Sequence, residues 1–309
     1  MIKIYQLEEA KKDLLKRNPI YQDSYSPATL ARTESVFGEG VMPHQAVMQI
    51  LQSIDEDGDK AVQKWNATLD RFDEPNFKIG KDELAAAYER ISARLQEVLE
   101  KSATRIRDFH ERQPVTSWLT NEMGGEIGQR FTAIERVGIY VPGGTAPLPS
   151  SLLMSVIPAQ VAGVKDVVVC TPPNPHDSIL AAAYICGVDE ICQVGGAQAI
   201  AAMAFGTETL PRVDKIVGAG NLFVTLAKQQ LYGLVGFDGL AGPTETMVIA
   251  DEEANPAWVA ADLLAQAEHD VQASAILLTT SADFAKKVQA AVTEQTAKLS
   301  RAEIIEESL

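Results

Sequence analysis

The 309-residue sequence contains only three cysteines, and none of them belongs to a Cys-x-x-Cys pair. Cys170, Cys186 and Cys192 each fall in an apolar stretch, so we expect reduced, buried thiols rather than a disulfide framework or a cysteine zinc site. Reduced thiols are typical of the cytoplasm. The first residues, MIKIYQLEEAKKDLLK, become charged too early for a secretory signal peptide, which also predicts a cytoplasmic protein.

The sequence also lacks long apolar runs and an excess of positive charge. Its most apolar stretch, residues 150–164, is too short to cross a bilayer and contains Pro158. The formal net charge of −15 would be repelled by nucleic acid and by anionic membranes, so neither is predicted as a partner. Small anionic ligands are not excluded, because they bind locally at helix N-termini.

Several familiar catalytic motifs are missing. No strand-like run is followed by Gly-x-Gly-x-x-Gly, and there is no P-loop, nucleophile elbow or His-Glu-x-x-His motif. The sequence therefore excludes the standard dinucleotide fingerprint, the P-loop hydrolases, the α/β-hydrolase esterases and the zincin proteases.

A regular alternation of strand-like and helix-like runs begins near residue 138. Strands are predicted over 138–141, 166–171, 190–194, 215–217, 246–250 and 275–279. Helices are predicted between them, over 151–162, 178–186, 197–205, 221–232 and 256–269. This alternation indicates right-handed βαβ units and a largely parallel sheet, which is the α/β fold class.

The preceding part of the chain is mainly helical, and the total length predicts about two domains. A single long helix is predicted over residues 81–111, with an apolar seam formed by Leu84, Tyr88, Ile91, Leu95 and Val98. Such a seam is typical of a core or of a dimer interface. Between residues 117 and 140 the pattern changes to strands, with a turn at 123–125.

Three glycine-containing loops each follow a predicted strand and begin a helix, at residues 141–147, 195–198 and 218–221. Tyr140 leads into the first loop, Gln198 closes the second, and Asn221 closes the third. Loops after parallel strands meet at the carboxyl edge of a sheet, where α/β proteins bind ligands. We expect a crevice for an anionic or nucleotide ligand there, although glycines also serve simple tight turns.

A polar cluster, QAEHD, ends the helix predicted over 256–269. Gln266 and His269 are three residues apart, which places their Cβ atoms roughly 5–6 Å apart on one helix face. An imidazole and an amide oxygen could hold one metal ion, but two ligands do not close a site. The alternative is a helix-terminal His that interacts with the helix dipole. His44 and His110 are predicted to be structural or surface residues.

These observations leave three kinds of protein open: a metal-assisted hydrolase, a dehydrogenase, or a non-catalytic binder of a small molecule.

Ordered motifs narrow this choice, because together they resemble the L-histidinol dehydrogenase family from about residue 47 to residue 309. They are DGDKAV (57–62), FD (72–73), RVGIYVPGG (136–144), VGGAQAIA (194–201), VDKI (213–216), AGPTE (241–245) and QAEH (266–269). The resemblance implies two Rossmann-like parallel-sheet domains in the aldehyde dehydrogenase-like architecture, with an N-terminal helical region. It implies that residues 1–135 join 245–309 in one discontinuous α/β domain, and that 136–244 form the NAD-side domain.

The resemblance also assigns roles to individual residues. It implies NAD contacts from Tyr140, Gln198 and Asn221. It implies a substrate contact at Thr244, and both zinc and substrate contacts at Gln266 and His269.

The activity implied by the resemblance is the last step of histidine biosynthesis. A zinc-dependent homodimer in the cytoplasm oxidises L-histidinol to L-histidine, using two NAD molecules and an aldehyde held on the enzyme. The family's acid/base Glu-His pair and remaining zinc ligands would fall after Leu309, so the resemblance predicts no catalytic residue in this chain and little or no turnover. The alternative is a non-catalytic nucleotide- or metabolite-binding protein on the same scaffold.

Overall fold

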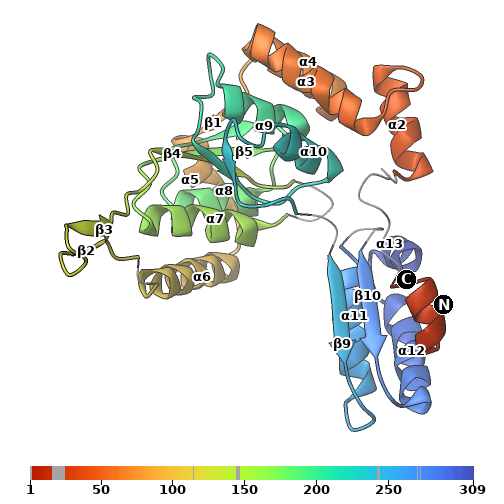
Figure 1. Ribbon diagram of the computed structural model, residues 1–309. Helices are drawn as coiled ribbons and strands as arrows, with labels where there is room; N and C mark the ends of the chain where they lie inside the picture. The colour runs from red at the N-terminus through yellow and green to blue at the C-terminus, as the bar shows by residue number, and fades with distance from the viewer. Residues whose placement is uncertain are drawn as a thin grey trace. The chain divides into compact units, whose positions relative to one another are not determined.

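The computed structural model describes residues 2–15, 25–113, 115–143, 147–241, 244–269, 271 and 273–309. The chain divides into two compact units, shown in Figure 1. The larger unit is Tyr25–Ala241, and the smaller unit combines Met1–Ser24 with Gly242–Leu309.

A six-stranded sheet forms the centre of the larger unit. Its strands, in spatial order, are β1 (Lys78–Gly80), β6 (Glu190–Gln193), β5 (Asp166–Thr171), β4 (Arg136–Tyr140), β7 (Lys215–Val217) and β8 (Gly236–Phe237). All neighbours are parallel except β1, which is antiparallel to β6. The order reverses at β4, which has β5 on one side and β7 on the other, so this is the topological switch point of the sheet.

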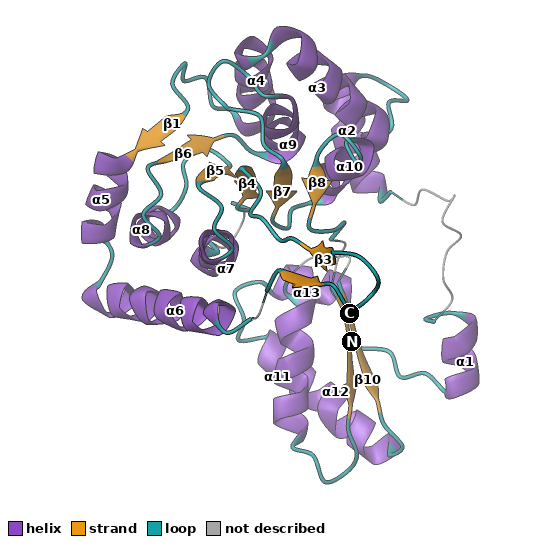
Figure 2. Ribbon diagram, turned by 60° about the vertical axis from the view of Figure 1, so that its left-hand side comes forward, coloured by secondary structure: helices purple, strands orange, loops and turns teal. Residues whose placement is uncertain are grey.

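Helices cover both faces of this sheet (Figure 2). One face is covered by α3 (Pro43–Asp57), α4 (Asp59–Trp65), α9 (Gly196–Phe205) and α10 (Leu222–Gln230). The other is covered by α5 (Lys81–Arg90), α6 (Ala93–Glu111), α7 (Pro149–Val161) and α8 (Asp177–Ile185). Two buried faces explain why the strands are almost continuously apolar rather than alternating.

Side chains of successive strand residues enter opposite cores, as the strand period of two requires. Tyr140 and Cys170 pack with α3 and α9, whereas their neighbours Ile139 and Val169 pack with α7 and α8. The last side chain of β4 therefore faces the α9 side of the sheet, next to the loop that begins α9.

The larger unit also contains helix α2 (Pro27–Phe37), a single π-helical turn η1 (Asn66–Asp70), and a hairpin of β2 (Trp118–Thr120) and β3 (Ile127–Gln129).

The smaller unit is a second parallel β-α-β arrangement. It contains β9 (Glu245–Ile249), α11 (Pro256–Ala267), β10 (Ser274–Leu278), α12 (Ala282–Thr296), α13 (Ala302–Ser308) and the N-terminal α1 (Leu7–Lys12). Its core is built from Leu263, Leu264, Phe284, Val288 and Ile305. The Gln289 side-chain amide donates to the carbonyl of Ile2 at 2.6 Å, which attaches the beginning of the chain to α12.

The predicted α/β class with parallel sheets is confirmed, and the helices and strands predicted from residue 138 onward lie within two residues of their observed ends. The division of the chain differs from the predicted one. Residues 25–135 lie with 136–241, because α3 packs on α9, α5 packs on α8 and α6 packs on α7. Only the N-terminal segment joins the residues after 241.

The single long helix predicted over 81–111 is wrong, because the chain breaks between α5 and α6. Ser92 begins α6, and its hydroxyl accepts a hydrogen bond from the Leu95 backbone N–H at 3.3 Å. The break rotates the apolar seam, so that Leu99 is buried and Val98 is 40% exposed. The rest of the seam packs in the core of this unit.

None of the described helices is long and apolar enough to cross a membrane.

The three thiols are free and buried, as predicted. Burial raises the pKa of Cys186 to about 12. The pKa of Cys170 is also raised, mainly by its hydrogen bond with Cys192 and in addition by burial.

Because only the thiolate reacts, Ellman's reagent at about pH 8 should find almost no reactive thiol in the native chain and all three thiols in denaturant. Rapid reaction of a native thiol would contradict this packing.

Candidate functional site

Tyr140, the last residue of β4, joins two of the predicted loops. Its side chain is 3% exposed, and its hydroxyl oxygen accepts a hydrogen bond from the Gly196 backbone N–H at 3.1 Å. Burial raises the pKa of the phenol to about 12, so the hydroxyl is neutral near pH 7 and keeps a proton to donate. The end of β4 is thus bonded to the beginning of α9.

Gln198 lies in the first turn of α9 and is 1% exposed. Its Nε2 donates to the Asp70 carboxylate at 2.8 Å, while its Oε1 has no partner among the described residues. An ionised carboxylate can only accept hydrogen bonds, so the nitrogen of the amide must face Asp70. The amide oxygen is therefore available to a hydrogen-bond donor of a ligand or to water.

Asp70 was not predicted, and it ends the π-helical turn η1. Burial raises the pKa of its carboxyl, whereas the hydrogen bond from Gln198 and the charge of Arg32 lower it. π-Helical turns are rare and are frequent at functional sites. The sequence offers little signal for such a turn, because its composition is that of an ordinary helix end.

Two further buried polar atoms lie at the same edge. Asn66, at the start of η1, donates through Nδ2 to the carbonyl of Gln193 at 3.0 Å, but its Oδ1 has no partner among the described residues. Thr171 pairs with Gln193 in the sheet, and its Oγ1 likewise lacks a partner within the described part of the chain. Buried polar atoms are nearly always bonded, so these oxygens mark where water or ligand groups bind.

Asn221 begins α10 at the third loop. Its side-chain oxygen accepts hydrogen bonds from the backbone N–H groups of Phe223, at 3.0 Å, and Val224, at 3.2 Å. The side chain is exposed and keeps its amide N–H₂ as a donor. Asn221 therefore both caps the helix and presents a donor at its N-terminus.

The first and third loops meet at the switch point. Gly218 has φ +117°, and a Cβ atom there would lie 2.0 Å from the carbonyl oxygen of Tyr140. Only glycine permits this approach. In the first loop, Gly143 lies against Pro172, while residues 144–146 fall outside the described part of the chain. The predicted meeting of the strand-to-helix loops at one sheet edge is confirmed for the parts that the structure describes.

In the smaller unit, Thr244, Gln266 and His269 lie at the amino-terminal edge of the two strands. Thr244 is exposed and directly precedes β9, and its carbonyl accepts from the Ser274 N–H at 2.8 Å. Gln266 is in the last turn of α11, and His269 is exposed just beyond it. The His269 N–H donates to the Gln266 carbonyl at 3.1 Å, which continues the helical turn.

This donor set suits part of a zinc site. A neutral imidazole and an amide oxygen are acceptable zinc ligands, and both side chains come from one helical turn. The described residues contain no group of three or more His, Cys, Asp and Glu side chains that could hold a metal ion. Gln266 and His269 can therefore supply two donors, while a closed site needs others.

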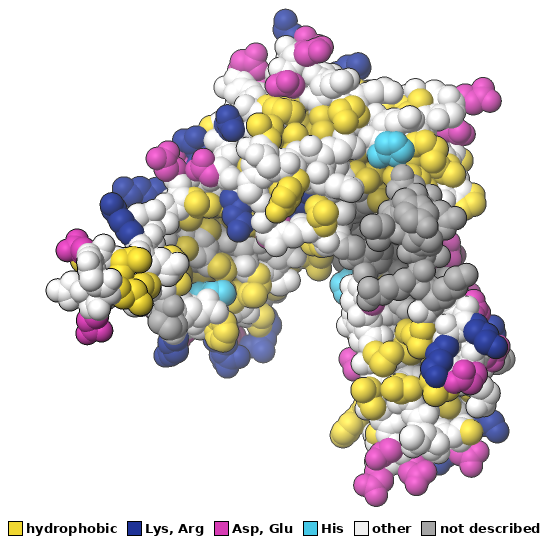
Figure 3. Space-filling view, in the orientation of Figure 1, with side chains coloured by type: hydrophobic (Ala, Val, Ile, Leu, Met, Phe, Trp, Pro, Cys, Tyr) yellow, Lys and Arg dark blue, Asp and Glu magenta, His cyan; other side chains and the backbone are white. Residues whose placement is uncertain are grey.

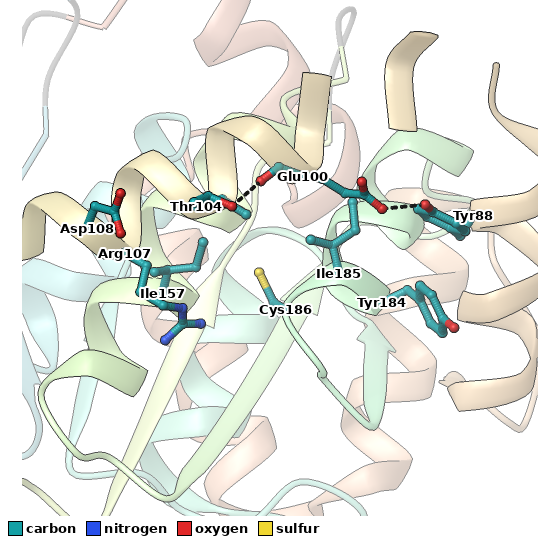
Figure 4. Close-up of a pocket in the computed structure, with 10 residues that line it drawn as sticks. Tyr88, Glu100, Thr104, Arg107, Asp108, Ile157, Tyr184, Ile185 and Cys186 are labelled. Atoms are coloured by element: carbon teal, nitrogen blue, oxygen red, sulfur yellow. Dashed lines mark hydrogen bonds between the residues drawn. The ribbon is translucent and has the colours of Figure 1, made fainter. Parts of the chain in front are cut away.

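A separate groove of about 720 Å³ lies on the side of the larger unit that is formed by α5, α6, α7 and α8 (Figure 4). It is lined by α6, α7 and α8 together with Tyr88, whose hydroxyl donates to Glu100 at 2.6 Å. Cys186 also lines it, but burial keeps this thiol protonated. The groove contains none of the residues predicted to bind NAD, zinc or substrate.

The switch point of a parallel sheet, where these polar side chains lie, is the usual position of a ligand site in α/β proteins. Comparisons with known proteins specify the class further. A family model described as histidinol dehydrogenase matches residues 39–309.

The chain is 48% identical to the histidinol dehydrogenase of Thermosynechococcus vestitus over 90% of this chain and 66% of that protein. It is 44% identical to that of Aquifex aeolicus over 99% of this chain and 68% of that protein. The crystal structure of histidinol dehydrogenase from Elizabethkingia anophelis superposes with a TM-score of 0.82 at 37% identity, over 90% of this chain and 67% of that one. The chain belongs to the histidinol dehydrogenase family, and it spans about two-thirds of the length of these relatives.

Replacing Asp70 should reveal its buried charge as a pH-dependent stability difference. Asp70→Asn is expected to raise the unfolding free energy near pH 7, because it removes the charge and keeps an oxygen for the Gln198 amide. The gain should be only a few tenths of a kcal/mol, on the order of 1 °C in Tm, since solvent screens a partly buried group.

The sign of the pH dependence follows from the raised pKa. The wild-type unfolding free energy falls as pH rises from the unfolded-state pKa, near 3.8, through the higher folded-state pKa. The advantage of D70N should thus be present at pH 7 and shrink as the pH falls towards the unfolded-state pKa near 3.8, as measured by urea unfolding. A difference that is independent of pH would contradict a buried charge at this position.

Proposed function

We propose that this chain supplies the nucleotide-binding residues, and part of the zinc- and substrate-binding residues, of a histidinol dehydrogenase. That enzyme would oxidise L-histidinol to L-histidine with two NAD molecules, through an aldehyde held on the enzyme, in the last step of histidine biosynthesis. The observation that carries the proposal is the meeting of Tyr140, Gln198 and the loop before Asn221 at the switch point of a parallel sheet. The family assignment supports the proposal that this edge binds a nucleotide.

The chain's own groups suit a dinucleotide at this edge. Tyr140 offers a neutral hydroxyl, Gln198 a buried amide oxygen, and Asn221 an amide N–H₂ group. The N-termini of α9 and α10 favour phosphate oxygens through the helix dipole. These local interactions permit an anionic ligand to bind despite the net charge of −15.

We propose that Gln266 and His269 hold zinc and that Thr244 contacts the substrate. When bound, zinc would supply an electrophilic anchor for the imidazole and amino groups of L-histidinol. The exposed imidazole of His269 and the partly exposed amide of Gln266 are accessible for this role.

No general acid or base is assigned to this chain. His176 accepts a hydrogen bond from the Ser178 N–H as the cap of α8, and His110 bonds to Gln113. His44 packs against Tyr25. These partners favour the structural roles predicted for His44 and His110. Low turnover of L-histidinol by this chain stays a prediction.

The proposed assembly is a cytoplasmic homodimer without nucleic-acid or membrane partners. Apolar side chains gather on the hairpin of β2 and β3, which Figure 3 shows in yellow. The exposed ones are Trp118, Leu119, Met123 and Ile127. An apolar patch of this kind supports an association surface, because an isolated two-stranded hairpin is marginally stable in water.

Binding of NAD should depend on the buried amide oxygen. Gln198→Ala is expected to weaken NAD binding about 10-fold, since loss of a buried hydrogen bond costs about 1–3 kcal/mol. Isothermal titration calorimetry would measure this, with Gln52→Ala on the exposed side of α3 as the matched control. Equal affinities for Q198A, Q52A and wild type would remove Gln198 from the site.

Retention of zinc should depend on the turn that ends α11. Gln266→Ala and His269→Ala should each lower the zinc that remains after dialysis, as measured by atomic absorption, because each removes one ligand atom. His110→Ala, on a helix of the other unit, is the control and should leave the zinc content unchanged. Unchanged zinc in both site variants would reject the assignment.

A non-catalytic nucleotide-binding protein is the second candidate, because Tyr140, Gln198 and Asn221 are suited to binding a ligand and none of them is assigned a role as a general acid or base. The two candidates differ in their response to L-histidinol. Zinc-dependent binding of L-histidinol, or NADH formation from it, would exclude the non-catalytic candidate.

A further inference from the structure

Lys228 is a buried cation that the proposed function does not use. It lies on α10, its side chain is 2% exposed, and its neighbours on the helix, Leu226 and Ala227, belong to the apolar core. Lysine is almost never buried to this degree without a partner. Its contacts therefore indicate what it does.

The Lys228 ammonium donates to two acceptors, which are the carbonyl of Gly218 and a carboxylate that is itself bonded to Gly218. It donates to the backbone carbonyl of Gly218, and it donates to one carboxylate oxygen of Asp238 at 2.7 Å. The other oxygen of Asp238 accepts from the backbone N–H of Gly218 at 2.8 Å. A single ion pair thus holds both polar backbone groups of Gly218. We call Lys228, Asp238 and Gly218 the loop clamp.

The clamped residue has a conformation that requires support. The φ of Gly218 is +117°, and its backbone presses against the Tyr140 carbonyl at the end of β4. Glycine reaches this φ without steric cost, but it has more backbone freedom than any other residue, so contacts are needed to hold it in one conformation. The loop clamp supplies hydrogen bonds on both sides of this residue.

The clamp also fixes the direction in which α10 begins. Gly218 opens the loop that ends at Asn221, and Lys228 lies two turns into the helix that Asn221 caps. The bond from Lys228 back to Gly218 closes this loop onto its own helix. The position of the Asn221 amide relative to the Tyr140 hydroxyl therefore depends on the clamp.

A role in stability alone explains the pair poorly. Burying an ion pair has a desolvation cost that often matches its attraction, and an apolar side chain of similar size usually packs at least as well. Holding one peptide group in one orientation is a task that an apolar side chain cannot perform.

We propose that Lys228 and Asp238 are positioning residues that hold the Gly218–Asn221 loop in the shape that receives the nucleotide. This inference rests on the proposed nucleotide site. It adds a pair of residues that do not touch the ligand but determine its affinity through Gly218 and Asn221.

Lys228→Met is the appropriate variant. It removes the cation and keeps the apolar length of the side chain, and it leaves Asp238, which is 39% exposed and can be hydrated. Replacing Asp238 instead would leave a buried, unpaired ammonium and would endanger folding. Leu231→Ala is the matched control, because Leu231 is buried at the end of the same helix and contributes only to packing.

The experiment measures the Kd for NAD and the Tm of wild type, K228M and L231A, with binding measured well below every Tm. The expected result is an NAD affinity at least 10-fold weaker in K228M and changed less than about twofold in L231A. The Tm of K228M should fall no further than that of L231A.

Wild-type affinity in K228M would overturn the positioning role while leaving the nucleotide site intact. An equal loss of affinity in L231A would also overturn it, because general destabilisation would then explain both results. A wild-type chain that binds no NAD would overturn the proposed function together with this inference.

Discussion

The close approach of the β7–α10 loop to the end of β4 organises the larger unit. Parallel strands β4 and β7 are neighbours, yet the chain leaves them for helices on opposite faces of the sheet, so the loops that follow them separate at the carboxyl edge. Gly218 has no Cβ and can press against the Tyr140 carbonyl. That contact places Gly218, which opens the loop ending at Asn221, against the end of β4. It also leaves the Tyr140 hydroxyl to bond with Gly196 on the other side of the switch point.

The two units present their polar groups at different edges of their sheets. In the larger unit the proposed nucleotide-binding residues follow the carboxyl ends of the strands, where α/β proteins commonly bind ligands. In the smaller unit Thr244 and the turn containing Gln266 and His269 precede the strands, at the amino edge. Tyr140 and Gln198 are buried and held by hydrogen bonds, whereas Asn221, Thr244 and His269 are exposed. A buried amide whose oxygen still lacks a hydrogen-bond partner suits the recognition of a defined cofactor. Accessible nitrogen and oxygen atoms suit metal binding.

The sequence predicted the parallel β-α units well, because their strands are apolar runs ended by glycine-containing turns and each such signal is local. It also singled out Tyr140, which ends β4, and Gln198 and Asn221, which lie at the starts of helices next to those turns. Their contacts with NAD stay a prediction. The break between α5 and α6 was missed, because a single Ser cap interrupted an otherwise continuous helical pattern. The domain division was missed for a different reason: which sheet the N-terminal helices cover depends on contacts between residues distant in sequence, such as those of α3 with α9. Asp70 and the loop clamp were not predicted for the same reason. Asp70 is 128 residues from Gln198 in the sequence. A local pattern predicts that Lys228, like most lysines, is a surface residue, whereas its side chain is buried.

Hydrogen–deuterium exchange of the chain with and without NAD tests most directly whether the switch point is the nucleotide site. Slower exchange is expected at residues 195–198 and 218–224, where backbone N–H groups begin α9 and α10. The groove lined by Tyr88, Arg107 and Tyr184 should be unaffected. Protection of that groove, with unchanged exchange at both helix N-termini, would contradict the assignment of the sheet's carboxyl edge as the nucleotide-binding site.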